Sequence, residues 1–366
     1  MVTSIIRQAR NSWRVGRVIW SRFMGGDPPY LPVLLLFLTD RCNLRCVMCG
    51  VCDRESRREV PELTAAEWLG VLDSAKRLGT MLVSISGGEP MLRRDLEEII
   101  AGAAERGMRV HMCSNGLLMT PKRVRALADA GLRAVSISID HLEPEGHEAL
   151  RGRGTWARTL KGVQTLREHA PEIRVSINTL ITRENYEILP EMLTFARELG
   201  VHQVKFMPVH AHMLHKGMPP GSEERLFFRP EDLPALEKAM VRLREACARS
   251  GMLTTSPGFL KKVARVYEGP IPHSCFAGYA VAAVTATGDV SACLDKAGVF
   301  NVRNAPLHEM WRSRAFHEAR REVRACSTPC WDTTNAELSL KLNPVTAVAD
   351  WRHLWWAFRF YLGGLE

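Results

Sequence analysis

The sequence lacks an apolar segment long enough to cross a bilayer. The run Leu31–Leu38 has eight residues, whereas a spanning helix needs about 20. It follows charged residues, as the core of an export signal would, but no small-residue cleavage site comes after it. We therefore expect a buried strand here, in a cytoplasmic protein.

Cysteine is too sparse for a secreted fold held by disulfides, with ten residues in a chain of 366. Eight of them fall into two groups, which are Cys42, Cys46, Cys49 and Cys52 near the start and Cys275, Cys293, Cys326 and Cys330 near the end. Such clustering favours metal or iron–sulfur ligation in a reducing cytosol.

Acidic residues are missing from residues 1–26, which hold five arginines. The chain carries a net charge of +9, and five units of it come from this segment. The remainder is an ordinary balance, so no nucleic-acid partner is expected. A hydrophobic content of 46% allows one large domain with or without an appendage.

Short apolar runs alternate with longer amphipathic stretches between residues 32 and 250. The predicted strands are Val33–Thr39, Met81–Ser86, Arg109–Ser114, Ala134–Ile139, Arg174–Leu180 and Val201–Met207. Helices are predicted near 64–79, 94–107, 121–131, 155–169, 186–199 and 231–250. Such alternation predicts parallel βαβ units. Six repeats are too few for a full eightfold barrel and fit a partial (β/α)6, TIM-like barrel of the α/β class over residues 31–250.

The pattern changes after Pro270. Residues Tyr279–Cys293 alternate around Gly288, which with the following aspartate is a strong hairpin turn signal. We interpret residues 270–335 as a small cysteine-bearing subdomain, and residues 336–366 as an aromatic-rich tail.

Cys42, Cys46 and Cys49 directly follow the first predicted strand. Functional loops in parallel α/β folds lie at the carboxyl ends of strands, so we expect these thiols to face the site. Three thiolates can bind three irons of a cubane and leave the fourth iron open, whereas four-cysteine sites serve electron transfer. Zinc is the alternative, because Cys52 could supply a fourth ligand.

The CxxxCxxC loop after the first strand of a partial barrel resembles that of the radical SAM superfamily. The resemblance covers residues 32 to about 335. It implies that the open iron of a [4Fe-4S] cluster binds S-adenosylmethionine (SAM), whose reductive cleavage gives a 5′-deoxyadenosyl radical. That radical would abstract hydrogen from an organic substrate. A reductant such as flavodoxin or ferredoxin is implied as a partner.

Polar motifs at later strand ends extend the resemblance. Gly87, Gly88 and Glu89 match the family's GGEP motif, in which the glycines permit close backbone approach and the glutamate can accept from the SAM amine. The resemblance assigns Ser138 to the SAM carboxylate or ribose and Asn178 to the ribose or adenine. Capping of the following helices is the alternative role for such strand-end residues.

Two residues near the first loop depart from the family pattern. Relatives often carry an aromatic residue near the adenine where this chain has Met48, and a methionine can pack there. Cys52 is an additional thiol, which we interpret as free or as a neighbour of the cluster.

The second cysteine group resembles the SPASM/twitch appendage of the same superfamily, including Gly288 five residues before Cys293. Four cysteines imply one fully ligated auxiliary [4Fe-4S] cluster, held by Cys275, Cys293, Cys326 and Cys330. It would transfer electrons or brace the substrate pocket. The final pair is spaced CxxxC where relatives often have CxxC. A four-thiolate zinc site is the alternative.

The substrate class stays open at this point. A small carbohydrate suits the four-cysteine appendage, and a lipid-linked substrate suits the ends of the chain. A peptide is the less favoured alternative. A peptide substrate would usually come with a recognition domain, and only about 30 residues precede the first strand, too few for a separate one. A non-catalytic iron–sulfur or zinc protein is the least favoured reading.

The two ends of the chain are amphipathic or strongly aromatic. In a helix, residues 5–24 place apolar side chains on one face and arginines on the other, with Val18 the main exception. The basic segment 1–30 could lie on an anionic membrane or pack its apolar stripe against the barrel. Residues 351–362 are apolar on all sides but too short to span a bilayer. We expect peripheral contact with the inner membrane face, or pairing of the ends with each other or with a second subunit.

Other polar residues near the predicted strand ends are candidates for substrate contact. His210, His212 and His215 follow the sixth strand, and a mobile polar loop is favoured over a metal site. Asp140 and His141 end the fourth strand and could also touch substrate.

Overall fold

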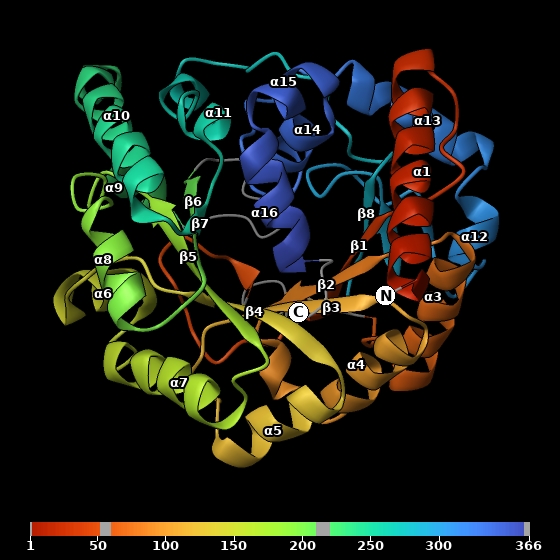
Figure 1. The fold of residues 1–366 in the computed structure, drawn as a ribbon, viewed down its shortest axis with the longest axis horizontal. Coiled ribbons are helices and arrows are strands. Elements are labelled where there is room, and N and C mark those ends of the chain that lie inside the picture. The colour runs from red at the N-terminus through yellow and green to blue at the C-terminus, as the bar shows by residue number, and fades with distance from the viewer. Residues whose placement is uncertain (1, 52–59, 210–219, 362–366) are drawn as a thin grey trace.

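Parallel strands and helices alternate along the protein, as the sequence predicts (Figure 1). The computed structural model describes residues 2–51, 60–209 and 220–361. The strands are β1 (Val33–Thr39), β2 (Leu82–Gly87), β3 (Arg109–Ser114), β4 (Leu132–Ser138), β5 (Arg174–Ile181), β6 (Gln203–Pro208), β7 (Leu253–Thr254), β8 (Val281–Val284), β9 (Asp289–Ser291) and β10 (Phe300–Asn301). The helices up to β7 are α1 (Val2–Met24), α3 (Ala65–Arg77), η1 (Pro90–Leu92), α4 (Leu96–Glu105), α5 (Pro121–Asp129), α6 (Pro144–Arg151), α7 (Trp156–His169), α8 (Glu191–Glu198), α9 (Ser222–Leu226), η3 (Pro230–Asp232) and α10 (Leu233–Ser250). Those after β7 are α11 (Pro257–Leu260), η4 (Ala264–Tyr267), α12 (Leu307–Met310), α13 (Arg314–Arg324), α14 (Ala336–Leu342), α15 (Pro344–Ala349) and α16 (Trp351–Tyr361).

The described strands form one sheet in the order β10-β9-β8-β1-β2-β3-β4-β5-β6-β7. Neighbours from β8 through β1 to β7 run parallel, as at Leu35 opposite Ser84. Helices α3, α4, α5, α7 and α8 form an outer ring around the curved sheet (Figure 1). Because β1 is covered on both faces, its run of leucines is almost wholly buried.

The hairpin that the sequence sets apart as an appendage shares this sheet. Strand β8 pairs in parallel with β1, with Val281 opposite Val33, and β9 then runs antiparallel to β8. The turn between them contains Gly288, whose φ is +96°. The second cysteine region is therefore an extension of the barrel sheet. Strand pairing over 248 residues of separation leaves no local sequence signal.

Local signals set the helix starts where the sequence expects them. Thr64 caps α3, because its hydroxyl accepts from Glu67 N at 3.3 Å while the Glu67 carboxylate accepts from Thr64 N at 2.7 Å. Helix α6 was not anticipated, although Pro144 at its first position is a known start signal. This short helix matters because its end reaches the first cysteine loop.

Helix α16 closes the end of the barrel at which the strands begin. Its Ala357 and Phe360 pack with Ala134 and Leu253, near the starts of β4 and β7. The Arg174 guanidinium, at the start of β5, lies over the Phe360 ring at 5.7 Å. In Figure 1 the helix lies across the middle of the ring. This end of the barrel is called the base below, and the opposite end carries the cysteine loop.

Helix α1 packs beside the base through Val18, the main exception to the division of the helix into an apolar and a basic face. Val18 is fully buried with Phe276, Tyr279 and Ala280, and Leu338 and Leu342 of α14 pack against the same cluster. Helix α1 thus meets α14, while the described contacts of the aromatic segment in α16 are with Ala134 and Leu253.

Much of the apolar stripe of α1 is exposed. Its described aromatic and methionine side chains are each at least half exposed, and they are Trp13, Trp20, Phe23 and Met24. The alternative that the stripe packs on the barrel holds in part, because Ile19 packs against the Val18 cluster and the ring of Phe23 meets that of Phe276 edge-on. Among the described residues, no helix combines the length and the apolar character that crossing a bilayer requires.

Candidate functional site

The first cysteine loop lies at the carboxyl end of β1, opposite the base. Cys42, Cys46 and Cys49 are each half-buried, and the loop turns tightly, with Cys49 N donating to Cys46 O at 3.0 Å. Val47 N donates to Leu150 O at 3.0 Å, which ties the loop to α6. The predicted position of the three thiols at a strand end is thus what the structure has. Cys52 lies outside the described residues.

Gly87 and Gly88 bring the end of β2 against the start of this loop. Gly88 N donates to Thr39 O at 2.7 Å, and Glu89 N donates to Arg41 O at 2.8 Å. A Cβ on Gly88 would lie 2.1 Å from Arg41 O, and Gly87 has a φ of +130°. Only glycine fits such a close backbone approach. The two glycines therefore hold the segment that leads into Cys42.

Glu89 joins the ends of β2 and β3. The buried carboxylate accepts from Met91 N at 3.1 Å, Ser114 Oγ at 2.9 Å and Asn115 N at 2.8 Å. The Asn115 amide in turn donates to Asn43 Oδ1 in the cysteine loop, at 2.8 Å. This positioning role was not predicted from the sequence. The predicted contact of Glu89 with the SAM amine stays a prediction.

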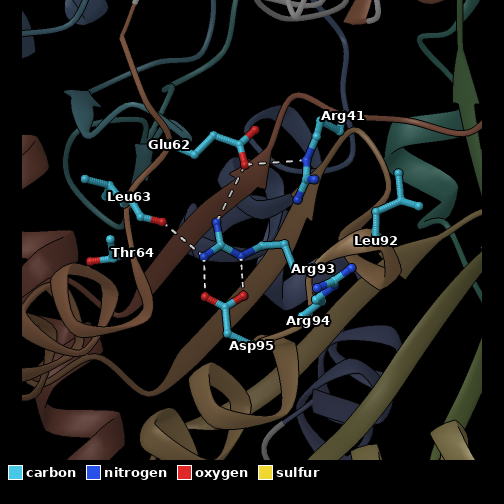
Figure 2. Close-up of a pocket in the computed structure, with 8 residues that line it drawn as sticks. All are labelled: Arg41, Glu62, Leu63, Thr64, Leu92, Arg93, Arg94 and Asp95. Carbon is cyan, nitrogen blue, oxygen red and sulfur yellow. Dashed lines mark hydrogen bonds and ion pairs between the residues drawn. The ribbon is translucent and has the colours of Figure 1, made fainter.

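Arg93 fixes the strand ends beside the loop. Its buried guanidinium donates to Leu38 O at 2.8 Å and Leu63 O at 3.0 Å and pairs with Asp95 at 2.6 Å. Figure 2 shows it between Asp95 and Glu62, in the wall of a cavity of about 610 Å³. Arg41 reaches the same carboxylate from the loop, with 3.9 Å between Arg41 Nε and Glu62 Oε2. The approach to Cys42 is thus braced by alternating charges.

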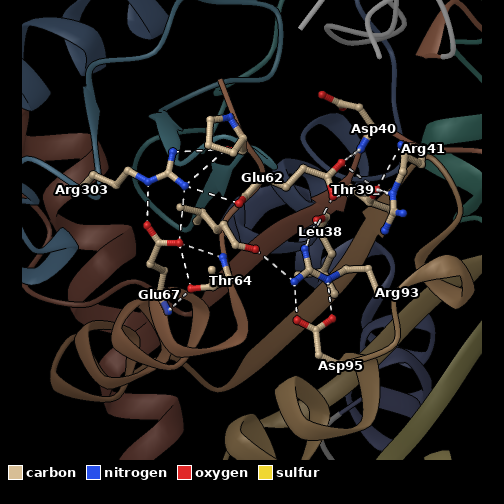
Figure 3. A network of polar contacts seen from close by, with 12 residues as sticks. Leu38, Thr39, Asp40, Arg41, Glu62, Thr64, Glu67, Arg93, Asp95 and Arg303 are labelled. Carbon is tan, nitrogen blue, oxygen red and sulfur yellow. Dashed lines mark hydrogen bonds and ion pairs between the residues drawn. The ribbon is translucent and has the colours of Figure 1, made fainter. Parts of the chain in front are cut away.

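A second set of contacts links this brace to the C-terminal region. Glu62 Oε1 accepts from Thr39 Oγ1 at 2.8 Å and from Asp40 N at 3.0 Å. Arg303, which follows β10, donates to Glu67 at 2.6 Å and to Glu62 O at 3.4 Å (Figure 3). The hydrogen bond from Arg303 lowers the pKa of Glu67 to about 2, so this ion pair persists in moderate acid. The two cysteine regions are therefore mechanically joined.

A buried ion pair flanks the thiols on their other side. Arg151 Nε donates to Asp140 Oδ2 at 2.5 Å, and Asp140 Oδ1 accepts from Leu180 N at 2.8 Å. Burial opposes the charge of Arg151, but the Asp140 carboxylate and the sulfurs of Cys46 and Cys49 raise its pKa. A permanent cation thus stands beside two of the thiols.

The Asp140 contacts give this residue a structural role. The side chain is fully buried and holds Arg151 and the backbone of β5, and the substrate contact suggested for Asp140 stays a prediction. His141 is partly exposed, and its Nδ1 accepts from Glu143 N at 3.1 Å at the start of α6. His210, His212 and His215 lie outside the described residues.

Ser138 and Asn178 stand opposite each other at the ends of β4 and β5. Both are partly exposed, on the side of the sheet that faces the barrel interior. The Asn178 amide nitrogen lies 3.9 Å from Cys113 Sγ, while its buried Oδ1 has no hydrogen-bond partner among the residues that the structure describes. A buried acceptor without a donor suits a site completed by a ligand. The SAM contacts predicted for both residues stay predictions.

A polar chain deeper in the barrel was missed by sequence reasoning. His111 bonds through its two ring nitrogens to Ser84 Oγ at 2.9 Å and Ser136 Oγ at 2.8 Å. Lys205 Nζ donates to Ser136 Oγ at 3.0 Å. Burial, with Lys205 nearby, lowers the pKa of His111 well below its usual value, so the imidazole is neutral. Polar residues at alternate strand positions were the available signal.

Met48 does not lie open to a ligand. It is buried with Leu150, Leu180, Val209 and Leu226, and this cluster carries the loop on an apolar support. The expectation that Met48 packs near an adenine therefore finds no support in its burial.

The second cysteine group gathers between β8, β9 and the segment before α14. Burial raises the pKa of Cys275 to about 11, and Asp332 and Cys326 add to the shift. Burial likewise raises the pKa of Cys293 to about 12, with Cys275, Asp295 and Asp332 contributing. The pKa of Cys330 is raised by burial and by the same neighbours. Cys275 therefore interacts electrostatically with each of the other three cysteines.

Two features brace this second group. Arg22 of α1 donates to Cys275 O at 2.7 Å. Trp331, next to Cys330, is fully buried, stacks on Phe259 and donates to Phe259 O at 3.0 Å. Among the described residues, no three His, Cys, Asp or Glu side chains are close enough to hold a single metal ion.

Comparison with protein families identifies both cysteine regions. Residues 36–196 match the family model of the radical SAM superfamily, and residues 275–332 match that of SPASM, an iron–sulfur cluster-binding domain. The first span contains the loop thiols and the GGEP motif, and the second contains all four later cysteines. The prediction of iron–sulfur clusters in place of zinc is confirmed at family level.

Similar proteins extend over most of the chain. PqqA peptide cyclase of Gluconobacter oxydans is 30% identical over 305 residues, which are 81% of this chain and 81% of that protein. AdoMet-dependent heme synthase of Methanosarcina barkeri is 29% identical over 308 residues, or 80% of this chain and 85% of that protein.

Solved structures bear out the fold. SuiB of Streptococcus suis, bound to precursor peptide SuiA, matches with a TM-score of 0.65 at 20% identity, covering 86% of this chain and 72% of that one. The same protein bound to S-adenosylmethionine gives a TM-score of 0.63. At these identities the likeness shows the fold, and the partial-barrel prediction is confirmed.

Proposed function

The chain belongs to the radical SAM superfamily and carries a SPASM iron–sulfur domain, and on that premise we propose that it modifies a peptide substrate. The observation that carries this proposal is the 30% identity with a protein named as a peptide cyclase, over 81% of both chains. It favours a peptide over the carbohydrate or lipid-linked substrate expected from the sequence.

The argument against a peptide concerned the short segment of about 30 residues before the first strand, and the likeness to a peptide cyclase outweighs it in this proposal. An alignment that covers 81% of each chain means that the two proteins are of nearly equal length. A protein of this size can therefore be named a peptide cyclase with no additional long segment. A recognition domain within the same chain is not a requirement for such a substrate.

In this proposal the residues around the first loop hold the cofactors in place. Cys42, Cys46 and Cys49 would bind the [4Fe-4S] cluster, which when loaded with SAM supplies a hydrogen-abstracting radical. Gly87 and Gly88 hold the loop against β2, and Arg151 keeps a positive charge beside two of the sulfurs.

Substrate would enter above the polar interior of the barrel. Asn178 offers an acceptor that no described residue bonds, and Lys205 opposite it offers a cation. A peptide presents both amide donors and carboxylates, so the two side chains suit its backbone and acidic groups. The hydrogen-bonded pair of neutral His111 and Ser136 lies beneath this polar surface.

The electron supply forms part of the same proposal. Arg41, Arg45 and Arg94 are exposed around the loop and the adjoining cavity. Such a cationic rim suits an acidic one-electron carrier such as flavodoxin or ferredoxin. The auxiliary cluster at Cys275, Cys293, Cys326 and Cys330 would accept an electron from the substrate radical or brace the pocket.

A tetrapyrrole is the second candidate substrate. It is favoured by the 29% identity with AdoMet-dependent heme synthase over 80% of this chain. A carboxylate-bearing macrocycle would also suit Lys205. The two candidates differ in size and in absorbance, so they can be told apart directly.

The test uses the anaerobically reconstituted full chain. We expect about eight irons per chain, four for each cluster, and formation of 5′-deoxyadenosine with dithionite and SAM. Short peptides encoded beside the gene, and iron coproporphyrin, are then added separately. Peptide modification seen as a mass change supports the proposal. Turnover of the porphyrin with no change in any peptide would replace it by the second candidate.

A further inference from the structure

A cavity of about 260 Å³ lies at the base, between α1 and the starts of β2 and β3. It is lined by Arg10, Asn11, Arg14, Lys76, Gly79, Thr80, Met81, Arg106, Gly107 and Arg109. Half of these described lining residues are cations and none is acidic. Three separate elements supply the charges, so the cavity is more than one helix face.

The cations are held close together by contacts with the barrel. Arg14 Nη1 donates to Gly79 O at 3.4 Å, and its guanidinium lies over the Tyr30 ring at 5.3 Å. Burial and the neighbouring Arg10 lower the pKa of Arg14, because a second positive charge is unfavourable there. Arg106 is fixed by Asp73 at 2.8 Å and by Gly102 O at 2.9 Å. An anion in the cavity would relieve the repulsion.

An apolar surface borders this cavity on α1. Trp13 lies edge-on to Tyr30 at 5.7 Å, and Arg17 lies over its other side at 5.7 Å. Trp20 and Met24 continue the same face and are 64% and 65% exposed. Aromatic side chains beside arginines on one helix are typical of a helix that lies in a membrane interface.

The C-terminal helices α15 and α16 add further exposed apolar side chains. Helix α16 caps the same end of the barrel. Both valines of α15 and several tryptophans of α16 are exposed, and they are Val345, Val348, Trp351, Trp355 and Trp356. In Figure 1, α16 crosses the middle of the ring while α1 stands at its edge. The loop that carries the first cluster lies at the other end of the strands.

We propose that the base docks on an anionic lipid bilayer, with a phospholipid phosphate in the cavity and the α1 tryptophans at the acyl boundary. Charge complementarity selects the occupant, since five cations line the cavity, one of which, Arg106, is already paired with Asp73, and phosphate is the anion that lipids present. The exposed aromatic face selects a lipid surface over a free anion. Docked in this way, the protein turns its cysteine loop away from the membrane. The proposal does not depend on the identity of the substrate.

Vesicle co-sedimentation of the reconstituted full chain tests this directly. The wild type is mixed with vesicles of phosphatidylcholine alone and with an equimolar mixture of phosphatidylcholine and phosphatidylglycerol. We expect binding to the anionic vesicles only, weakening with added salt. The variant R10Q/K76Q removes two exposed cations of the cavity and is expected to weaken binding on the order of 30-fold. The variant W20S/M24S is expected to lose the binding that survives at high salt.

Matched variants on α10 serve as controls, because this helix stands on the opposite side of the ring (Figure 1). K238Q/R242Q removes the same number of exposed charges, and V241S removes an exposed apolar side chain. Both should bind as the wild type does. Equal loss in R10Q/K76Q and K238Q/R242Q would overturn the proposal. So would absence of vesicle binding while inorganic phosphate raises the Tm of the wild type but not of R10Q/K76Q, since the occupant would then be a soluble anion.

Discussion

The two cysteine sites differ in the charges that lie beside their thiols, although a cation, Arg22, is also near Cys275 at the second site. Beside Cys46 and Cys49 stands the buried cation Arg151, which is held by Asp140. Beside the second group stand two carboxylates, Asp332 and Asp295, which help to raise the pKa of the thiols there. Adding an electron makes a cluster more negative, so a nearby cation favours reduction and nearby carboxylates oppose it. The structure thus biases the first site towards holding an electron.

The sites also differ in the number of thiols that they can supply to a cluster. The first group supplies three thiols on a half-buried loop, whereas the second supplies four from separated segments around a buried tryptophan. A site with a free iron can bind a ligand, and a fully ligated one cannot. The comparison assigns ligand chemistry to the first site and an electronic or structural role to the second.

Removing one thiol from each site should separate these roles most strongly. Cys46→Ala should abolish 5′-deoxyadenosine formation, because the first cluster is the site of SAM cleavage. Cys330→Ala should leave reductive SAM cleavage measurable, since the first loop is intact. Each variant should retain about four irons. The control Cys247→Ala, on α10, should keep both clusters. Loss of SAM cleavage in Cys330→Ala with four irons retained would contradict the division.

Replacing the cation of the first site tests its electrostatic bias. A unit charge about 8 Å away, in an effective dielectric of about 20, is worth ~2 kcal/mol, or ~90 mV for one electron. Arg151→Gln should therefore lower the reduction potential of the first cluster by up to this amount and slow SAM cleavage. Arg151→Lys should restore part of the shift. An electrochemical titration followed by electron paramagnetic resonance measures both, and Arg158→Gln on α7 is the control. An unchanged potential would refute the bias.

The second site should respond in the opposite direction and less strongly. Asp332→Asn removes a negative charge, and the amide oxygen can still accept from Thr334 N and Asn335 N, which now lie 2.7 and 2.6 Å from Asp332 Oδ1. Burial raises the pKa of Asp332, while hydrogen bonds from Asn335 and Thr334 oppose the shift, so the carboxylate carries its charge less readily than an exposed one. We expect the auxiliary potential to rise by less than the Arg151 shift. A fall in that potential would break the comparison.

The place of the first cysteine loop after β1 and the succession of the barrel strands along the chain could be predicted because their signals are local. Alternation of apolar runs gave the six barrel strands within about two residues of their ends. The charges that distinguish the two sites could not be found in this way. Arg151 is distant in sequence from the loop it flanks, and no helix was expected there. Arg93 and Glu62 likewise act through contacts that exist only after β1 and β2 have paired.

Helix α1 shows a different limit of sequence reasoning. The pattern of residues 5–24 predicted the helix and the division of its faces, but not which face the barrel would cover. The buried face is set by Val18 against Phe276 and Tyr279, which belong to a region more than 250 residues away. An amphipathic pattern specifies two faces and leaves their partners to tertiary contacts. Only the structure shows that the tryptophans face outward.

The smallest expected difference between the sites concerns buried histidines. His147 lies beside the Asp140–Arg151 pair, and burial with Arg151 nearby lowers its pKa to about 4. An unfolded histidine has a pKa of about 6.5. Between these values the unfolded chain binds a proton that the folded chain does not, so the free energy of unfolding falls as pH drops from about 6.5 to about 4. From pH 7.5 to 5.5 this should lower the free energy of unfolding by about 1 kcal/mol. His147→Gln should lose this part of the pH dependence, as measured by urea unfolding of the reconstituted protein.

At the second site, burial also lowers the pKa of His273, but a backbone acceptor and the Asp332 charge oppose the shift. His273→Gln should therefore change the slope less than His147→Gln does. If the two variants change the slope equally, or neither changes it, the electrostatic difference between the sites does not extend to their histidines.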